Sequence, residues 1–202
     1  MNKYELTDET KVFYGVTLHR IRALTAVGVL AAAGQLGGWV ESEKNLEQSG
    51  DAWVYGNAQV SGNARVSGDA RVSGDARVYG DAQVSGDAWV YGNARVYGNA
   101  RVSGNAWVSG GAWVSGNAQV YGDAQVYGDK LIFWATKVGR DNATLTVFNG
   151  KDGLIVTRGC FIGSVDEFLS KSEAEHDDAT HIEYRMLIEV AHSRITRALE
   201  AK

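Results

Sequence analysis

Residues 50–127 read GDAWVYGNAQVSGNARVSGDARVSGDARVYGDAQVSGDAWVYGNARVYGNARVSGNAWVSGGAWVSGNAQVYGDAQVY. The stretch consists of thirteen uninterrupted hexads of the form Gly-Asp/Asn-Ala-x-Val-Tyr/Ser. Alanine fills the third place and valine the fifth in all thirteen, and Gly111 is the one departure from Asp or Asn at the second place. The fourth place varies among Trp, Gln and Arg, and the sixth between Tyr and Ser. Self-similarity at a fixed period indicates a repeat architecture.

Each hexad predicts a short strand followed by a corner. In Ala-x-Val-x the alanine and valine point to one side and the variable residues to the other, as in a strand with one buried face. Glycine followed by Asp or Asn favours a tight corner, because these residues tolerate positive φ. One such strand cannot bury its apolar face alone, so successive strands wrap around a shared interior. Three hexads then close a triangular coil of 18 residues, and the coils stack at the strand spacing of about 4.8 Å.

The 18-residue period sorts the variable residues into three outward faces. The first face carries Trp53, Arg71, Trp89, Trp107 and Gln125 at the fourth place, flanked by Tyr55, Ser73, Tyr91, Ser109 and Tyr127 at the sixth. The second face carries Gln59, Arg77, Arg95 and Trp113, with Tyr79 and Tyr97. The third face is polar, with Arg65, Gln83, Arg101 and Gln119.

Aromatic and arginine side chains on two of these faces are the candidate binding or interface residues, because such residues are enriched in interface cores. On the first face they are Trp53, Tyr55, Arg71, Trp89, Tyr91, Trp107 and Tyr127. On the second face they are Arg77, Arg95 and Trp113. We expect Arg71 to lie between Trp53 and Trp89 in a stacked cation–π arrangement.

The flanks predict a division into an N-terminal β cap (1–26), the repeat region (27–129) and a small C-terminal α+β domain (130–202). Residues 3–24 have the pattern of two strands, which we expect to cover the open end of the solenoid. An imperfect first coil is expected to begin near Val27. Its apolar residues are expected to fall in phase with the repeat: Leu30 and Leu36 with the valines, Val40 and Leu46 with the alanines.

Beyond the repeat, the sequence predicts strands at 131–136, 144–149 and 154–157 and then two helices. The helices are expected to open at the capping boxes Ser164-x-x-Glu167 and Thr180-x-x-Glu183. The second helix carries an apolar stripe that needs a partner surface, made of Ile182, Met186, Val190, Leu187, Ala191 and Ile195.

Two resemblances refine this picture. Val-x-x-x-Ala-x, read from each valine, resembles the hexapeptide repeat of left-handed parallel β-helix proteins, which implies a left-handed coil and, since related proteins are typically trimers, an oligomer. The segments YELTDETKVFYGVTLHRIRAL (4–24), LGGWVESEKNL (36–46) and DEF after RGCFIG (158–168) resemble a family of uncharacterised hexapeptide-repeat proteins of phages and prophages. That family brings no established activity, and it suggests an accessory role against a host defence system.

Charge and hydropathy exclude several partners. The net charge of the 202 residues is −4 and is spread evenly along the chain, which argues against non-specific binding to nucleic acid or to membranes. The apolar run at 26–34 is far shorter than the roughly 20 residues of a membrane span. Acidic residues before this run (Glu5, Asp8 and Glu9) do not fit a signal peptide, so we expect a cytoplasmic protein.

The repeat argues against an enzyme. Hexapeptide-repeat acyltransferases and carbonic anhydrases need histidines on or beside the coils, as a base or as zinc ligands. The four histidines of this chain (His19, His176, His181 and His192) lie outside the hexads, and no loop interrupts the hexads. We therefore expect no catalytic residues, no metal site and no cofactor. The stacked corner residues Asp51, Asp69, Asp87 and Asp123 are interpreted as solvated turns.

The lone Cys160 rules out a disulfide framework. As a nucleophile it would need His176 or His181 to fold back to it. The preferred interpretation is a small buried apolar residue.

The prediction for function is a non-enzymatic β-solenoid that mediates interaction or assembly and binds a host macromolecule, such as a defence component. The aromatic first face is expected to be covered by the C-terminal helices or by another subunit of a dimer or trimer. One alternative is an oligomeric binder that sequesters a small nucleotide-like ligand in Arg–aromatic pockets. A weaker alternative is an enzyme that depends on Cys160 or resembles an acyltransferase.

Overall fold

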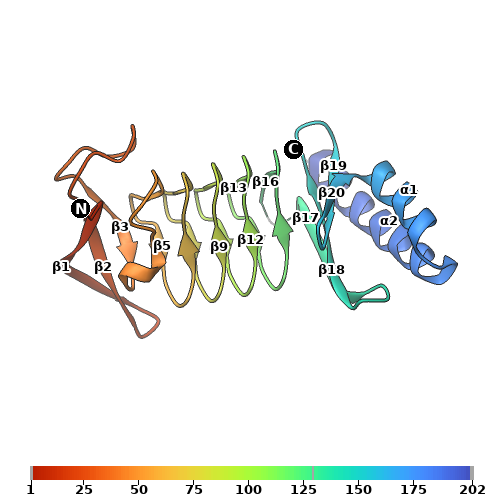
Figure 1. Ribbon diagram of the computed structural model, residues 1–202, viewed down its shortest axis with the longest axis horizontal. Helices are drawn as coiled ribbons and strands as arrows, with labels where there is room; N and C mark the ends of the chain where they lie inside the picture. Colours follow the sequence, from red (N-terminus) through yellow and green to blue (C-terminus); the bar gives the residue numbers. More distant parts are fainter. Residues whose placement is uncertain (1, 129, 201–202) are drawn as a thin grey trace.

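A computed structural model describes residues 2–128 and 130–200 (Figure 1). The predicted domain limits at residues 1, 129 and 202 lie outside these ranges. The molecule is elongated, with a β cap at its N-terminal end, a solenoid in the middle and an α+β domain at the other end (Figure 1).

The solenoid is built from three parallel sheets whose strands succeed one another around the coil. The first-face sheet has the order β4-β7-β10-β13-β16, the third-face sheet β6-β9-β12-β15, and the second-face sheet includes β5-β8-β11-β14. The strand bounds are β4 Trp53–Val54, β5 Gln59–Val60, β6 Arg65–Val66, β7 Arg71–Val72, β8 Arg77–Val78, β9 Gln83–Val84, β10 Trp89–Val90, β11 Arg95–Val96, β12 Arg101–Val102, β13 Trp107–Ser109, β14 Trp113–Val114, β15 Gln119–Val120 and β16 Gln125–Tyr127. Because Trp89 pairs with Arg71 on one side and Trp107 on the other, the predicted 18-residue period is confirmed.

The alanines and valines of the hexads fill the interior. All thirteen of each are 0% exposed, as their alternation predicts. Backbone bonds join each coil to the next, for example from Arg71 N to Ala88 O at 2.8 Å. The corner glycines have φ between +62° and +73°. At Gly104 a Cβ would lie 2.9 Å from Gly122 N, so close stacking of the corners requires glycine as well as positive φ.

The N-terminal cap continues the second-face sheet. An antiparallel hairpin of β1 (Tyr4–Phe13) and β2 (Val16–Ala23) pairs through β2 with β3 (Leu36–Val40), which in turn pairs in parallel with β5. Lys3 Nζ donates to the carbonyl oxygens of Ser49, Gly50 and Ala52 at 2.9–3.2 Å. The predicted pair of strands is therefore present, and it closes the first coil.

The predicted phase of the first coil is wrong. Val40 pairs with Val60 and Leu46 bridges to Val66, so both lie in the valine columns and not in those of the alanines. Paired residues of the first coil and the next are 20 residues apart in the sequence, compared with 18 between the regular coils. The difference arises because Leu46 and Val54 are eight residues apart, whereas successive valines of the hexads are six apart. The 3-10 helix η1 (Glu43–Asn45) precedes Leu46. Leu36, expected inside, is 43% exposed.

The C-terminal domain is a four-stranded antiparallel sheet with two helices on it. Its strands are β17 Ile132–Val138, β18 Ala143–Asn149, β19 Leu154–Arg158 and β20 Phe161–Ser164, and its helices are α1 Val165–Glu175 and α2 Asp178–Glu200. β20 is absent from the sequence-based prediction. The capping box of Ser164 and Glu167 is confirmed at the start of α1. The second one is wrong: Asp177 Oδ1 accepts from Thr180 N at 2.8 Å, so the helix begins earlier and Thr180 is buried in its first turn.

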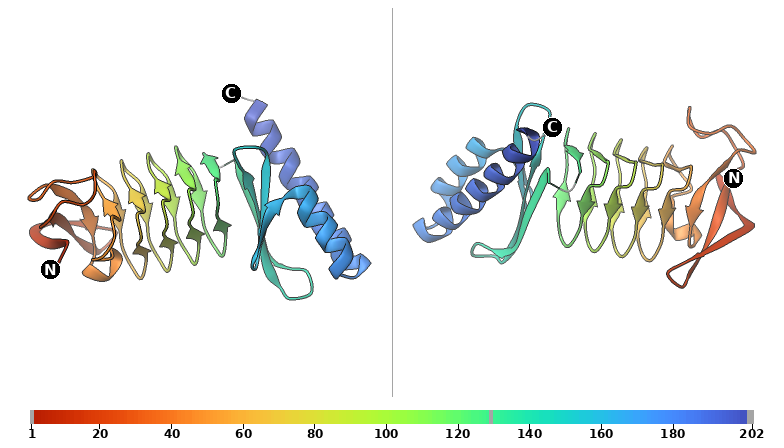
Figure 2. Two further views of the ribbon diagram at one scale, coloured as in Figure 1. Left: turned by 45° about the horizontal axis from the view of Figure 1, so that its top comes forward. Right: turned by 180° about the vertical axis from the view of Figure 1, so that it is seen from behind.

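The helices lie on the side of the sheet away from the solenoid (Figure 2). Ala191 and Ile195 are buried with Tyr184 and Ile188, which confirms one half of the predicted stripe. The other half is exposed, because Ile182, Met186 and Val190 project away from this packing face. The helices therefore do not cover the first face of the solenoid. Of the two coverings that we expected for this face, the C-terminal helices or another subunit, the first is excluded. Neither helix in the described part of the chain has both the length and the apolar character of a membrane span.

Candidate functional site

Four aromatic side chains gather on the first face. The Trp89 ring lies 4.6 Å from that of Tyr91 and 5.8 Å from that of Trp107, the latter at 75°. Trp89 Nε1 donates to Ser73 Oγ at 3.0 Å. Tyr127 lies two rungs beyond Tyr91. The pKa of the Tyr127 phenol is raised, mainly by burial and to a smaller extent by the neighbouring Tyr91. We call Trp89, Tyr91, Trp107 and Tyr127 the first-face cluster; Trp107 is its most accessible tryptophan, at 42% exposure.

Trp53 does not belong to this accessible surface. It is 0% exposed, because the Tyr4 ring lies against it at 6.3 Å and β3 passes over it; a Cβ on Gly37 would come within 2.8 Å of Trp53 Cζ2. Tyr55 is half-buried and packs against the same core. The expected exposure of Trp53 is therefore wrong, since the cap covers the first rung.

Arg71 lies in register between Trp53 and Trp89, as predicted, but the stacked cation–π arrangement is not formed. Trp53 is buried under the cap, and the Trp89 indole contacts Ser73, Tyr91 and Trp107. Across residues 2–128 and 130–200 the arginines that do lie over aromatic rings include Arg77 and Arg95 of the second face.

The second face holds a hollow of about 270 Å³, which we call the hairpin groove. Phe13, Tyr14 and Val16, at the turn of the β1–β2 hairpin, form one wall. Side chains of β5, β8 and β11 and of the residues that follow β5 and β8 form the other, among them Gln59, Ser61, Arg77, Tyr79 and Arg95. Two of the three second-face candidates, Arg77 and Arg95, therefore line this groove, and Trp113 lies beneath Arg95.

Positive charge gathers beside the groove. Arg77 Cζ lies 4.3 Å from the centroid of the Phe13 ring, and Arg95 Cζ lies 5.0 Å from that of Trp113. Lys11 Nζ lies 4.2 Å from the centroid of the Trp39 ring. The pKa of Lys11 is lowered, mainly by burial and to a smaller extent by repulsion from Arg20 and Arg77. Neither Arg77 nor Arg95 forms an ion pair with a carboxylate of the described residues.

Two tyrosines form a stacked ladder along the same face. The rings of Tyr79 and Tyr97 are 4.9 Å apart with an interplanar angle of 1°. Burial and the neighbouring Tyr97 raise the pKa of Tyr79, so its phenol is neutral at physiological pH. On the next rung toward the cap the corresponding position is Ser61, and the ladder ends there.

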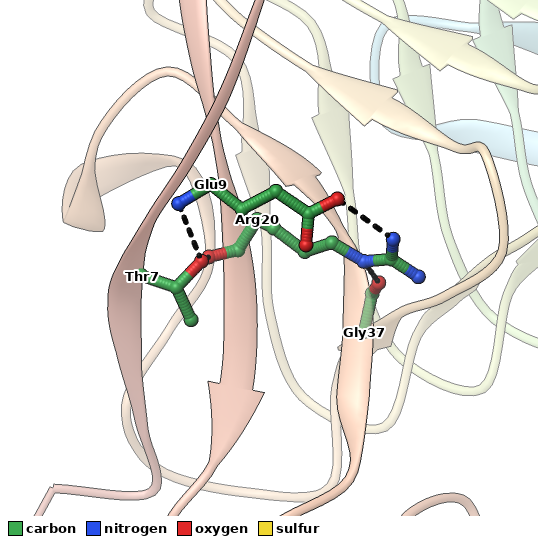
Figure 3. A network of polar contacts seen from close by, with 4 residues as sticks. All are labelled: Thr7, Glu9, Arg20 and Gly37. Atoms are coloured by element: carbon green, nitrogen blue, oxygen red, sulfur yellow. Dashed lines mark hydrogen bonds and ion pairs between the residues drawn. The ribbon is translucent and has the colours of Figure 1, made fainter.

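A polar network fixes the hairpin over the sheet (Figure 3). Arg20 Nε donates to Gly37 O at 3.2 Å and Arg20 Nη1 to Glu9 Oε1 at 3.2 Å. Thr7 Oγ1 donates to Arg20 O at 3.0 Å, next to the break in register between Leu6 and Thr10. The wall formed by the hairpin turn is thus tied to β3 and so to the solenoid.

The remaining candidates for chemistry are separate from both faces. Cys160 is exposed in the turn between β19 and β20, so its interpretation as a buried residue is wrong. His176 packs against Tyr184, with ring centroids 5.6 Å apart, and His181 Nδ1 lies 3.3 Å from Ser172 Oγ. The described residues contain no group of three His, Cys, Asp or Glu side chains arranged to hold a metal ion. In the corner columns Asp69 Oδ1 accepts from Asp51 N at 3.1 Å.

The sequence-based prediction missed the hairpin wall of the groove. Phe13-Tyr14-Gly15 does carry a turn signal, and Tyr14 and Gly15 have φ of +47° and +78°. That signal marks a turn, but it does not say which face of the solenoid the turn lies over.

One family of known proteins matches the repeat region. The YdcK Beta solenoid repeat matches residues 58–74, 70–86, 82–98, 88–102, 94–110 and 100–116. The chain is a β-solenoid repeat protein. These matches together cover residues 58–116, under a third of the β-solenoid chain, and leave the cap and the C-terminal domain unmatched. No curated protein matches the chain.

Proposed function

We propose that this β-solenoid is a non-enzymatic assembly and recognition protein, and that its first-face cluster binds a second copy of the same chain. The observation that carries the proposal is the position of the cluster. Trp89, Tyr91, Trp107 and Tyr127 lie on one parallel sheet, beyond the reach of the cap that buries Trp53. The C-terminal helices lie beyond the end of the solenoid (Figure 2). Aromatic clusters at the surface mark interaction sites, and Trp and Tyr are enriched in interface cores.

A second copy suits this face because its charge is low. Around the cluster the fourth-place column carries a single cation, Arg71, and ends in Gln125. An isologous contact brings the same patch of both subunits together, so a nearly neutral patch avoids repulsion between like charges. The third face, with Arg65 and Arg101 exposed, is less suited to such a contact. The similarity to hexapeptide-repeat proteins, which are typically trimers, also favours an oligomer.

Sedimentation velocity of Trp107→Glu beside the parent tests the assembly. We expect a dimeric or trimeric parent and a folded variant of lower mass, because a carboxylate buried in the interface would be unpaired. Gln83→Glu, which adds the same charge on the exposed third face, is the matched control and should sediment like the parent. A monomeric parent, or an oligomer unchanged by Trp107→Glu, would refute the proposed interface.

The wider role that we propose is that of a phage or prophage accessory protein, which acts in the host cytoplasm and binds a host defence component. The support is the similarity of segments 4–24, 36–46 and 158–168 to hexapeptide-repeat proteins of phages. Expression of the chain should raise plaque formation of a sensitive phage on a host that carries the defence system, and should not do so on an isogenic host without it. A plaque count on the defence-carrying host that expression leaves unchanged, or an equal rise on both hosts, would contradict this role.

A further inference from the structure

We infer that the hairpin groove binds a phosphorylated planar ligand of mononucleotide size, stacked on Tyr79 and held by Arg77. This site is on the second face and is independent of the proposed assembly through the first face. Three features of the groove carry the inference: an interrupted aromatic stack, arginines without carboxylate partners, and a hollow of matching size.

The tyrosine ladder supplies a stacking surface that ends inside the groove. Tyr97 stacks on Tyr79 at 4.9 Å, and Ser61 occupies the equivalent position on the next rung, where Ser61 N donates to Val78 O at 3.0 Å. The hollow lies beside Ser61 and Tyr79, and the hairpin turn at Tyr14 forms its wall. A planar ring placed above Ser61 would therefore continue the stack. Stacking of nucleobases on aromatic side chains uses the same geometry.

The arginines supply the anion-binding part. Arg77 and Arg95 pair in register on adjacent strands, so their backbones are about 4.8 Å apart. Lys11 adds a third cation, and the negative charge of Asp75 partly offsets the lowering of its pKa. Like charges on adjacent strands repel, and a phosphate bound between the two side chains would relieve the repulsion. Guanidinium groups bind phosphate oxygens in bidentate fashion, which makes arginine suited to this role.

The volume limits the size of the ligand. At about 270 Å³ the hollow lies just below the roughly 300–1,000 Å³ of typical ligand pockets. A base with one phosphorylated sugar is of this order, whereas a nucleic-acid strand needs a continuous cationic groove. Here the cationic column is interrupted after two rungs, because Trp113 follows Arg95 and Gln59 precedes Arg77.

Filling the groove gives the sharpest test. Ser61→Tyr would extend the ladder into the hollow and retain every cation, and the repeat itself accepts tyrosine at the sixth place. Ser85→Tyr, on the third face, makes the same change away from the groove. In isothermal titration calorimetry with AMP on the full chain, we expect the parent and Ser85→Tyr to bind alike. Ser61→Tyr should bind at least about tenfold more weakly, since its ring occupies the place of the base.

The phosphate requirement is tested with a second pair. Arg77→Gln should raise the Kd for AMP by about tenfold or more, as expected for loss of a charge-assisted hydrogen bond, while Arg101→Gln on the third face should not. Adenosine and inorganic phosphate, titrated separately, should each bind more weakly than AMP.

Three results would overturn the site. The first is equal binding of AMP by Ser61→Tyr and Ser85→Tyr. The second is that none of AMP, GMP, CMP and UMP binds with a Kd below about 1 mM. The third is that a single-stranded oligonucleotide binds more than about tenfold tighter than AMP. Repeating the AMP titration with Trp107→Glu separates this site from the assembly interface, because that variant should bind AMP like the parent.

Discussion

The edge of the Tyr4 ring meets Trp53 with centroids 6.3 Å apart and planes at 73°, and both side chains are fully buried. Trp53 begins the same column that continues to Trp89 and Trp107. The same residue type in the same column therefore stabilises the cap at one end and forms an accessible surface further along. What decides its role is whether the N-terminal strands reach that rung.

This difference predicts opposite results for one substitution at two sites. Trp53→Ala should lower the free energy of unfolding by about 3–5 kcal/mol, because it leaves a cavity under the cap. Trp107→Ala, at an exposed site, should change the stability of the monomer by no more than about 0.5 kcal/mol. Urea unfolding at a protein concentration low enough to keep Trp107→Ala monomeric measures both. Equal losses would show that Trp107 is buried within the chain.

Tyr4 also predicts a pH dependence. Its hydroxyl donates to Leu46 O at 2.7 Å and Glu43 O at 3.0 Å, and burial, reinforced by Glu43, raises its pKa well above the ordinary value of 10. Above pH 10 the phenol ionises in the unfolded chain but keeps its proton in the folded one. The stability that Tyr4 contributes is thus complete below pH 10 and is lost progressively as the pH rises toward the raised pKa.

Tyr4→Phe isolates this effect. At pH 7 the variant should be less stable by about 1–3 kcal/mol, because the buried carbonyl group of Leu46 loses its donor. The difference from the parent should narrow above pH 10, where the parent alone loses the contribution of Tyr4. Urea unfolding of both proteins at pH 7, 9 and 11 measures the gap, and a gap that stays constant would contradict the assignment.

Two neighbouring residues test the direction of the hexad side chains. Val84 is 0% exposed, whereas Gln83 is exposed on the third face. Val84→Asp buries an unpaired carboxylate and should cost several kcal/mol, roughly 3 or more, whereas Gln83→Asp should cost less than about 1 kcal/mol. Thermal unfolding followed by circular dichroism is sufficient. Similar melting temperatures for the two variants would be incompatible with an interior lined by valine.

The repeat made most of the solenoid predictable. The spacing of six residues is strict from Gly50 to Tyr127, so each alanine and valine could be assigned to the interior and each fourth-place residue to its face. The first coil could not be assigned in this way, because two extra residues before Val54 shift Val40 and Leu46 into the valine columns. The six-residue spacing of the hexads therefore cannot be used to assign residues that lie before an insertion.

The candidate sites were predictable only in part. The columns that place Arg77 beside Arg95 and Trp89 beside Trp107 follow from the period alone. The hairpin wall at Phe13 and the burial of Trp53 depend on where the cap packs, which is a tertiary contact without a local signal. In α2 the residues of the apolar stripe were all expected to face one partner surface. Met186 and Ala191 are both apolar, and the register of the helix on the sheet decides which of them is buried.

Cys160 gives the last prediction. The thiol is exposed in the turn between β19 and β20, so a thiol-specific reagent should modify it fully in the folded protein. Because it packs into no core, Cys160→Ser should change the melting temperature by no more than about 1–2 °C. The variant should also keep the sedimentation behaviour and the AMP affinity of the parent, since Cys160 lies in neither the first-face cluster nor the hairpin groove. If Cys160→Ser instead abolished the effect on plaque formation while folding and assembling normally, the non-enzymatic proposal would have to give way to a cysteine-dependent enzyme.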